Sequence, residues 1–467
     1  MKRESGLRAA GLLARLAYAA CAACVVGPDT KPPDLAAPDA YAAGMAGGEG
    51  PSGPAWWRGF EDGALNALVV DALSGNLTVG VAEARLEEAL ALARAERSDP
   101  FPRVDGFAEA GLTEGISGGL GSGQETVGGL SFGFVPDLFG RRRRELEAAR
   151  AAAAAERFGL DDARRLITAQ VAGTYLELRR TDARLALLED SLDLQNRTLE
   201  IVRLRAEAGL AADLDVQRAL ADLAQTRAQR GPLAASRAQA DTLLAVLTAR
   251  PPGEQLVEPT GGAAVPSYAG EVAAGVPADL LRVRPDLRAA EADLVAATAR
   301  VGAEVADLYP SFSLPGAVTA DIGSSEALAG GVLAAITAVL DVPLLDGGRR
   351  RAEVRAARAR ADAALLSYER ALLVALRDVE TALVAIESAE ARRADLAVAV
   401  EASERAFRQL QALYTEGLAS LIDVLDAQRQ LITSREAFVN SEAELAASVV
   451  DFYTALGIEA LRPVSKR

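Results

Sequence analysis

A turn near the C-terminal end of the chain repeats a turn that lies 208 residues earlier. Gly417 follows Gly209 at this interval, and Asp423 follows Asp215 at the same interval. In both copies the glycine is followed, after a short gap, by an Asp-Val step that begins a new apolar pattern. Glycine commonly ends a helix, and the residues after it form the cap and first turn of the next helix. We therefore predict that both turns are the tips of hairpins between long helices.

The duplication extends over most of the chain. Leu86–Pro102 aligns with Leu294–Pro310 at the same offset, and each half contains a long stretch without proline that begins with several arginines. Such self-similarity indicates one structural plan used twice. We divide the ordered part into a first repeat at 62–253, an irregular connector at 254–277, a second repeat at 278–458 and a C-terminal tail at 459–467.

Apolar periodicity predicts the helices of each repeat. In the first repeat we expect one helix from about Asp62 to Arg97, a very long helix from Arg141 to about Ala208, and a returning helix to about Ala249. In the second, another very long helix ends near Glu416 and is followed by a last helix. Apolar heptads in these helices predict coiled-coil-like packing.

Each repeat also contains a region where the apolar pattern changes to period two. We predict strands at about Val104–Thr113, Gly129–Val135, Phe312–Ile322 and Val332–Val342. Four strands cannot close a barrel, and an open sheet edge is not tolerated in lipid. The alternation therefore leaves two interpretations. The strands belong to a barrel shared between copies, with 12 strands for three copies, or they form a small soluble sheet packed on helices.

The composition argues against several classes of function. Histidine is absent, and the only cysteines are Cys21 and Cys24. The usual general base, His-activated nucleophiles and His or Cys metal sites are therefore missing, and we expect no enzyme, no cofactor and no metal site. The net charge of −15 argues against a nucleic-acid partner, because binding phosphates needs a basic surface.

The N-terminus has the pattern of a bacterial export signal. Lys2 and Arg3 precede a stretch of small and apolar residues that ends at Cys24. We predict a signal peptide at 1–23 and a lipid-anchor segment with an extended linker at 24–61, in which Cys24 is acylated. The alternative is an ordinary signal peptide with incidental cysteines.

Several short motifs together resemble the TolC-like outer membrane factors, in their lipoprotein branch of OprM- and NodT-like channels. Trp56-Trp57 follows a Cys24 start, Arg284-Pro285-Asp286 matches the arginine-proline-aspartate signature, and Pro343–Gly348 matches the Pro-Leu-Leu-Asp-Gly-Gly element. The two glycine-to-Asp-Val turns also match the family.

This resemblance implies an α+β membrane protein. Internally duplicated helical hairpins would form a trimeric periplasmic α-barrel, joined to a shared 12-stranded transmembrane β-barrel with four strands per chain. The implied function is the outer-membrane exit duct of a tripartite efflux system for small molecules. Its implied partners are two further copies of the chain, a periplasmic adaptor protein, an inner-membrane pump of the RND type and outer-membrane lipid.

The resemblance also implies a pore gate at the hairpin tips. Asp423 and Asp426 match the pore-constricting aspartates of the family, and Asp215 is their counterpart in the first repeat. Arg218 occupies the position equivalent to Asp426, so we expect a bond between these two residues on neighbouring helices. Tyr414 matches a tyrosine of the closing network, whose partner arginine near Gly417 is replaced by Ala419.

A plainer role is open for the acidic residues of the tips. Ser420 and Asp423 have the spacing of an N-terminal capping box, and Asp215 is suited to the first turn of a helix. Two other functions also remain open for the chain as a whole. These are the outer-membrane channel of a type I protein secretion system and a coiled-coil scaffold without a pore.

Overall fold

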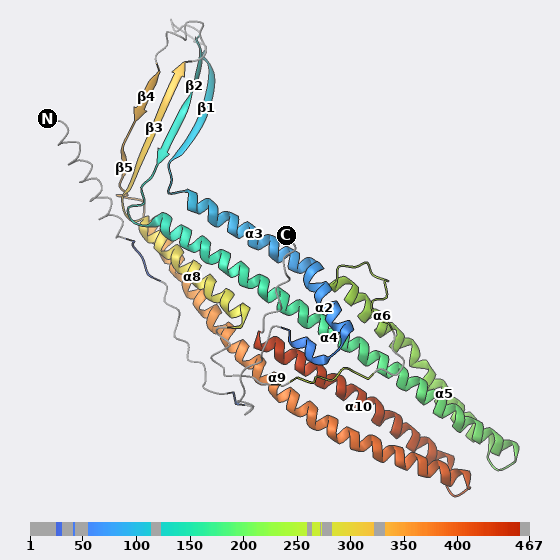
Figure 1. The fold of residues 1–467 in the computed structure, drawn as a ribbon. Coiled ribbons are helices and arrows are strands. Elements are labelled where there is room, and N and C mark those ends of the chain that lie inside the picture. Colours follow the sequence, from blue (N-terminus) through green and yellow to red (C-terminus); the bar gives the residue numbers. More distant parts are fainter. Residues whose placement is uncertain are drawn as a thin grey trace. The chain divides into compact units, whose positions relative to one another are not determined.

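The computed structural model describes residues 25–29, 41–42, 55–113, 123–258, 264–270, 272, 283–321 and 332–457 (Figure 1). The predicted signal peptide, Cys24 and the C-terminal tail lie outside the described residues. The chain forms two compact units. One, here called the strand unit, comprises Met1–Asp34, Arg85–Arg157 and Ala289–Arg370, and the other, the hairpin unit, comprises Leu35–Ala84, Phe158–Arg288 and Ala371–Arg467.

The strand unit contains one antiparallel sheet. Its strands are β1 (Arg103–Thr113), β2 (Gly123–Phe134), β3 (Ser311–Asp321), β4 (Leu333–Ile336) and β5 (Val339–Asp341), and their order is β1-β2-β3-β4 with β5 also paired to β3. Each of the four predicted strand regions is found in the sheet, and β4 and β5 together occupy the fourth position. The second strand begins earlier than expected, because pairing with β1 continues to Thr113 opposite Gly123.

The fourth strand was predicted to be continuous from Val332 to Val342, and this is wrong. It is interrupted at Thr337 and Ala338, although its two pieces keep a single register, with Gly316 opposite Ile336 and Ser313 opposite Val339. The interruption lies opposite Pro315, which has no N–H to donate to the ladder. The Thr337 amide still donates to the Pro315 carbonyl at 2.8 Å.

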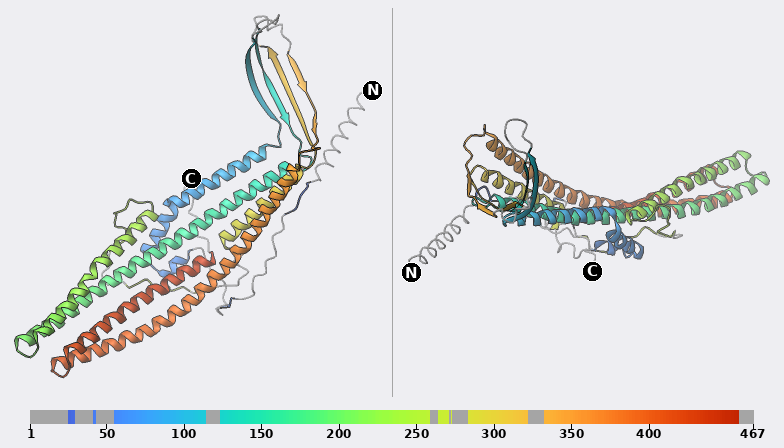
Figure 2. Two further views of the ribbon diagram at one scale, coloured as in Figure 1. Left: turned by 180° about the vertical axis from the view of Figure 1, so that it is seen from behind. Right: turned by 90° about the horizontal axis from the view of Figure 1, so that it is seen from above.

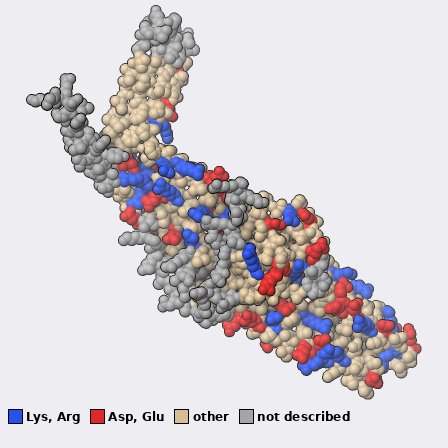
Figure 3. All heavy atoms as spheres, viewed as in Figure 1, with Lys and Arg blue, Asp and Glu red and all other residues tan. Residues whose placement is uncertain are grey.

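The two faces of the sheet differ in polarity. Paired residues share a face, so Val104, Phe132 and Ile336 lie on one side with Leu130 and Val318 two residues along. Four of these side chains are well exposed: Val104 at 61%, Leu130 at 55%, Val318 at 44% and Ile336 at 72%. The opposite face carries exposed Asp105 and Glu109. In Figure 3 the sheet presents few charged atoms, whereas the helices carry many of both signs.

The hairpin unit contains two helical hairpins, whose long helices each begin in the strand unit. The very long helices α4 (Arg141–Glu207) and α9 (Arg349–Thr415) end close to the predicted positions and then turn back as α5 (Asp213–Ala228) and α10 (Leu421–Leu456). Figure 2 shows the two hairpins side by side with both tips at the same end. Buried leucines of α4, including Leu188, Leu192 and Leu199, pack against Leu223 of α5, which confirms the expected apolar seam.

Two predicted helices are each divided into two. The returning helix breaks at Gln229 into α5 and α6 (Arg230–Leu247), because Pro232 lacks an N–H for the carbonyl four residues earlier. The first helix breaks into α2 (Gly63–Gly75) and α3 (Leu77–Ser98) at Asn76, whose Oδ1 accepts the Thr78 amide at 2.8 Å. Among the described helices, Gly63–Ser98 is the stretch long and apolar enough to cross a membrane by length and composition alone.

Two further helices lie at the beginnings of the two repeats. Helix α8 (Pro285–Ala306) opens the second repeat, and the short helix η1 (Trp56–Phe60) precedes α2. Trp56 of η1 stacks on Tyr453 of α10 with ring centroids 5.3 Å apart, and Tyr453 is hydrogen-bonded to Tyr268. Aromatic residues are rare in this chain, so this cluster is a distinct packing centre of the hairpin unit.

Candidate gate at the hairpin tips

The two hairpin tips have the same backbone geometry. Gly209 and Gly417 have positive φ angles of 71° and 79°. In each tip the residue after the glycine donates to a carbonyl five residues back: Leu210 to Arg205, and Leu418 to Leu413, both at 2.8 Å. This pattern is the Schellman motif, in which a left-handed glycine ends the helix. The glycine stops predicted from the duplication are therefore confirmed.

The second tip begins its returning helix with a capping box. The Ser420 hydroxyl oxygen accepts the Asp423 amide at 3.3 Å, and the Asp423 carboxylate accepts the Ser420 amide at 3.1 Å and its hydroxyl at 2.6 Å. The capping interpretation is confirmed. The hydroxyl of Ser420, and then its amide, hold the pKa of the exposed Asp423 carboxyl below its ordinary value.

The first tip lacks this cap. Ala212 occupies the N-cap position of α5 and provides no side-chain hydrogen bond, while Asp213 and Asp215 lie in the first turn. Acidic residues at a helix N-terminus interact favourably with its dipole. The first-turn position expected for Asp215 is therefore confirmed, and the two tips are stabilised by different means.

An apolar cluster joins the two hairpins just behind their tips. Val202 of α4, Tyr414 of α9 and Val424 of α10 are buried in it, and Val216 of α5 packs against its edge. Burial of these side chains supplies the general attraction between the hairpins, because apolar area removed from water stabilises at about 25 cal/mol per Å².

Arg205 of the first hairpin forms a cation–π contact and hydrogen bonds with the second hairpin. Its guanidinium lies 4.8 Å from the centroid of the Tyr414 ring, and its Nη1 donates to the carbonyls of Tyr414 at 2.9 Å and Thr415 at 3.1 Å. These are among the last carbonyls of α9, which have no partner within the helix. An arginine of one hairpin thus caps the end of the other. We did not identify Arg205 from the sequence. Its only signal there is a cation in the last turn before Gly209.

Burial raises the pKa of the Tyr414 hydroxyl. The Arg205 guanidinium opposes this effect, and the nearby Asp215 carboxylate adds to the increase. The Tyr414 side chain is only 5% exposed. Of the predicted gate residues, Tyr414 is therefore buried beneath the Arg205 guanidinium and is influenced by the charge of Asp215.

The predicted bond between Arg218 and Asp426 is not formed within the single chain. Arg218 pairs instead with Asp215, at 3.5 Å, one turn earlier on the same helix. Asp426 pairs with Arg429 at 2.8 Å, and Arg429 also reaches Asp222 of α5 at 3.1 Å. The charged link between α5 and α10 is thus made by Asp222 and Arg429, neither of which we identified from the sequence.

The surface of the tips combines acidic and apolar side chains. Asp423 and Asp426 are both exposed, so their carboxylates face solvent in the single chain. Leu210 is 68% exposed, Leu418 75% and Ile422 49%. An exposed group of large apolar residues of this kind is typical of an interaction surface.

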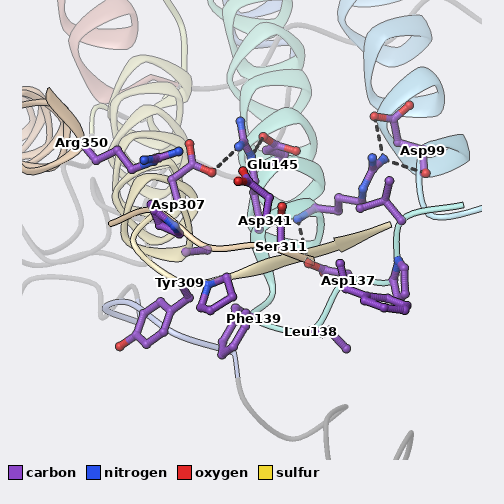
Figure 4. A pocket seen from close by; sticks show the side chains of 18 of the residues that line it. Asp99, Asp137, Leu138, Phe139, Glu145, Asp307, Tyr309, Ser311, Asp341 and Arg350 are labelled. Atoms are coloured by element: carbon purple, nitrogen blue, oxygen red, sulfur yellow. Dashed lines mark hydrogen bonds and ion pairs between the residues drawn. The ribbon is translucent and has the colours of Figure 1, made fainter. Parts of the chain in front are cut away.

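The arginines at the start of α4 have a structural role. Arg141 and Arg142 border a cavity of about 530 Å³ in the strand unit, beside the stacked rings of Phe139 and Tyr309 (Figure 4). Arg141 pairs with Asp307 and with Glu145, and Arg142 donates to the Asp99 carbonyl at 2.7 Å. Since these guanidinium groups have carboxylate or carbonyl partners from neighbouring elements, the contacts favour anchoring of the sheet base over binding of a ligand.

Comparison with known proteins identifies relatives over nearly the whole chain. The profile of the family described as outer membrane efflux protein matches residues 68–250 and again 276–458, and the two matches are displaced by the same 208 residues as the tips. Nodulation protein T of Rhizobium leguminosarum bv. viciae is 31% identical over 426 residues, which cover 91% of this chain and 88% of that protein. Outer membrane protein OprJ of Pseudomonas aeruginosa is 29% identical, covering 96% and 95%.

Solved structures show the same fold. The outer-membrane channel OprN has a TM-score of 0.85 and 34% identity, and the match covers 93% of this chain and 99% of that one. The open state of the Neisseria gonorrhoeae MtrE outer membrane channel has a TM-score of 0.82 and 26% identity, with coverages of 94% and 99%.

Proposed function

Since the chain belongs to the outer membrane efflux protein family and is an outer-membrane efflux channel, we propose that three copies form the exit duct of a tripartite pump. The observation that carries this proposal is the pair of equivalent helical hairpins, matched twice by the family profile, with their tips side by side. In this arrangement the tips surround one axis at the periplasmic entrance.

The sheet supports a barrel shared by the three copies. It has an exposed apolar face, an opposite face that carries Asp105 and Glu109, and open edges at β1 and β4. Lipid tolerates an apolar face but not unpaired edge groups, so the edges must pair with strands of other copies. Four strand positions per chain give 12 strands in the trimer.

The helices support a periplasmic tunnel. Helices α4 and α9 each contain 67 residues, which at 1.5 Å per residue corresponds to about 100 Å. Two such hairpins per copy supply a ring of long helices in the trimer. We assign the strands to the outer membrane and the hairpin tips to the periplasmic entrance of the duct.

We place the gate at the tips. Asp423, Asp426 and Asp215 are proposed to constrict the entrance, and their repeated carboxylates attract cations. Tyr414 and Arg218 belong to the surrounding network, in which Arg205 takes the place of the arginine that is absent at Ala419. Links between the two hairpins hold the closed state, and their loss lets the hairpins separate.

We propose that the partners of the duct are a periplasmic adaptor protein and an RND-type inner-membrane pump. The exposed apolar side chains of the tips, among them Leu210 and Leu418, are a suitable surface for the adaptor. Two relatives of this chain from Pseudomonas putida are named as outer membrane proteins of a solvent efflux pump and of a toluene efflux pump, and each is 30% identical over 409 residues. Small molecules are accordingly the proposed cargo.

We also propose that the chain is processed at its N-terminus. Removal of residues 1–23 and acylation of Cys24 would give a lipid-anchored protein, in agreement with the basic and apolar pattern of this segment. The mass of the N-terminal peptide from membrane-purified protein tests this directly.

Planar-bilayer conductance of the purified trimer tests the gate. We expect a small conductance for the wild type and a larger one for the double variant Asp423→Ala/Asp426→Ala. Asp395→Ala, which removes an exposed carboxylate from the shaft of α9, serves as the control and should leave the conductance unchanged. Trimeric protein that conducts in neither form would contradict the proposed function.

A further inference from the structure

A short segment at the start of the described chain packs closely against helices α4 and α8 of the strand unit. Val25–Asp29 runs along the first turn of α4 and the side of α8. The Val26 amide donates to the Phe139 carbonyl at 3.3 Å, immediately before α4 begins. The segment therefore touches the same loop that carries the base of the sheet.

Three glycines bring the segment close to the helices. Gly27 has a φ of 99°, and a Cβ atom added to it would lie 2.5 Å from the Cα of Gly302 in α8. A Cβ at Gly140 would lie 2.9 Å from the Cγ1 of Val25, and one at Gly302 would collide with the Arg144 side chain. Close backbone approach is thus required on both sides of the contact.

A buried arginine fixes the end of the segment. Arg144 is 5% exposed, and its Nη2 donates to the Asp29 carboxylate at 2.7 Å while its Nη1 donates to Glu147 at 2.9 Å. Charge-assisted bonds of this length are stronger than neutral ones. The site therefore combines a backbone hydrogen bond, glycine contacts and an ion pair, all directed at five consecutive residues.

We propose that Val25–Asp29 is a docking segment that fastens the N-terminus to the base of the sheet through Gly302 and Arg144. One peptide unit spans about 3.8 Å, so any group attached to Cys24 is tethered within a few ångströms of this site. The docking is inferred from the contacts of Val25–Asp29 and does not depend on acylation. Its consequence for a lipid rests on the proposed acylation of Cys24: the acyl chains would enter the membrane beside the strands of their own copy.

Amide hydrogen exchange of the full-length, detergent-solubilised protein tests the docking. We expect the exchangeable amides of Val26–Asp29, which are those of Val26, Gly27 and Asp29 because Pro28 has no N–H, to be protected in the wild type. Asp29→Ala and Gly27→Ala change only the segment and leave the folded helices intact, and each should accelerate exchange of these amides by about tenfold. Arg144→Ala should have the same effect from the other side of the contact.

Two controls separate docking from general destabilisation. Arg143→Ala removes a neighbouring arginine that pairs with Asp137, and Gly159→Ala adds a methyl group to α4 where nothing lies within 4 Å. Both should leave the exchange of Val26–Asp29 unchanged. Exchange that is equally fast in the wild type, Asp29→Ala and Gly27→Ala would overturn the proposal.

Cys24→Ser separates the docking from the lipid. If the site holds the segment by itself, the protection of Val26–Asp29 persists in this variant. If protection is lost, the lipid rather than the site holds the segment, and the proposal fails. The mass of the N-terminal peptide reports acylation independently, so an unmodified Cys24 would refute the lipid anchor while leaving the docking intact.

Discussion

The guanidinium of Arg205 lies over the ring of Tyr414 and donates to the Tyr414 carbonyl at 2.9 Å, although the two residues belong to different helical hairpins. A single side chain thereby caps one long helix from the end of another. In a duct whose opening requires the hairpins to separate, this contact must break, because it cannot be maintained after one helix end moves away from the other.

Replacement of Arg205 by alanine should therefore favour the open state. Loss of the cation–π contact and of the hydrogen bonds to the carbonyls should destabilise the closed state by about 1–2 kcal/mol per copy. This corresponds to a roughly tenfold decrease in the ratio of closed to open state for each copy. We expect a higher bilayer conductance for Arg205→Ala and an intermediate one for Arg205→Lys, which keeps the charge but not the planar fork. Arg203→Ala removes an exposed arginine two residues earlier and should behave as wild type. Unchanged conductance in Arg205→Ala would exclude a latch at this position.

The two exposed aspartates of the second tip should contribute unequally to cation selectivity. Asp426 is paired with Arg429 at 2.8 Å, whereas Asp423 bonds to the neutral Ser420. Asp423→Asn should consequently reduce the cation preference more than Asp426→Asn, and Arg429→Gln should increase it. Reversal potentials of the trimer across a KCl gradient measure all three. Equal effects of the two aspartate variants would contradict this assignment.

The capping box of α10 should weaken in acid. Hydrogen bonds from Ser420 lower the pKa of Asp423 in the folded chain, so the carboxylate stabilises the fold above the ordinary aspartate pKa of about 3.9. This contribution is lost as the pH falls through that value and then through the lower pKa of the folded state. We expect the thermal midpoint of the wild type to fall relative to Asp423→Asn over this range, because asparagine does not titrate. A difference that stays constant with pH would rule out a titrating cap.

Two arginines that share Asp378 should differ in their effect on stability. Arg284 is 3% exposed, donates hydrogen bonds to Asp286 at 2.7 Å and to the Ala455 carbonyl at 2.9 Å, and forms a longer ion pair with Asp378 at 3.6 Å. Arg377 bonds to the same Asp378 at 2.6 Å, but its side chain is 68% exposed.

Arg284→Ala should lower stability by about 1–3 kcal/mol, because it leaves the buried Ala455 carbonyl and the half-buried Asp286 carboxylate without their donor. Arg377→Ala should change it by less than about 1 kcal/mol. Thermal unfolding of the two purified variants compares them. A larger loss for Arg377→Ala would show that the arginine-proline-aspartate segment does not fasten the end of α10.

The sequence by itself determined the features that depend on residues within a turn of each other. The glycine stops at Gly209 and Gly417 and the capping box of Ser420 and Asp423 follow from local dihedral preferences and short-range hydrogen bonds. The 67-residue lengths of α4 and α9 follow from an uninterrupted apolar period without proline. The duplication was also evident, because it is a property of the sequence itself.

Only the tertiary structure decided which side chains meet between elements. Arg205 reaches Tyr414 across 209 positions of the chain, and Arg429 takes Asp222 as its partner, whereas the predicted pair of Arg218 and Asp426 is replaced by neighbours on the same helices. The fourth strand breaks opposite Pro315, on a strand distant in sequence. Such contacts depend on how packed helices and strands are rotated and shifted relative to one another. Apolar periodicity does not determine this rotation and shift, because a seam of leucines and alanines allows several charged pairings along its edge.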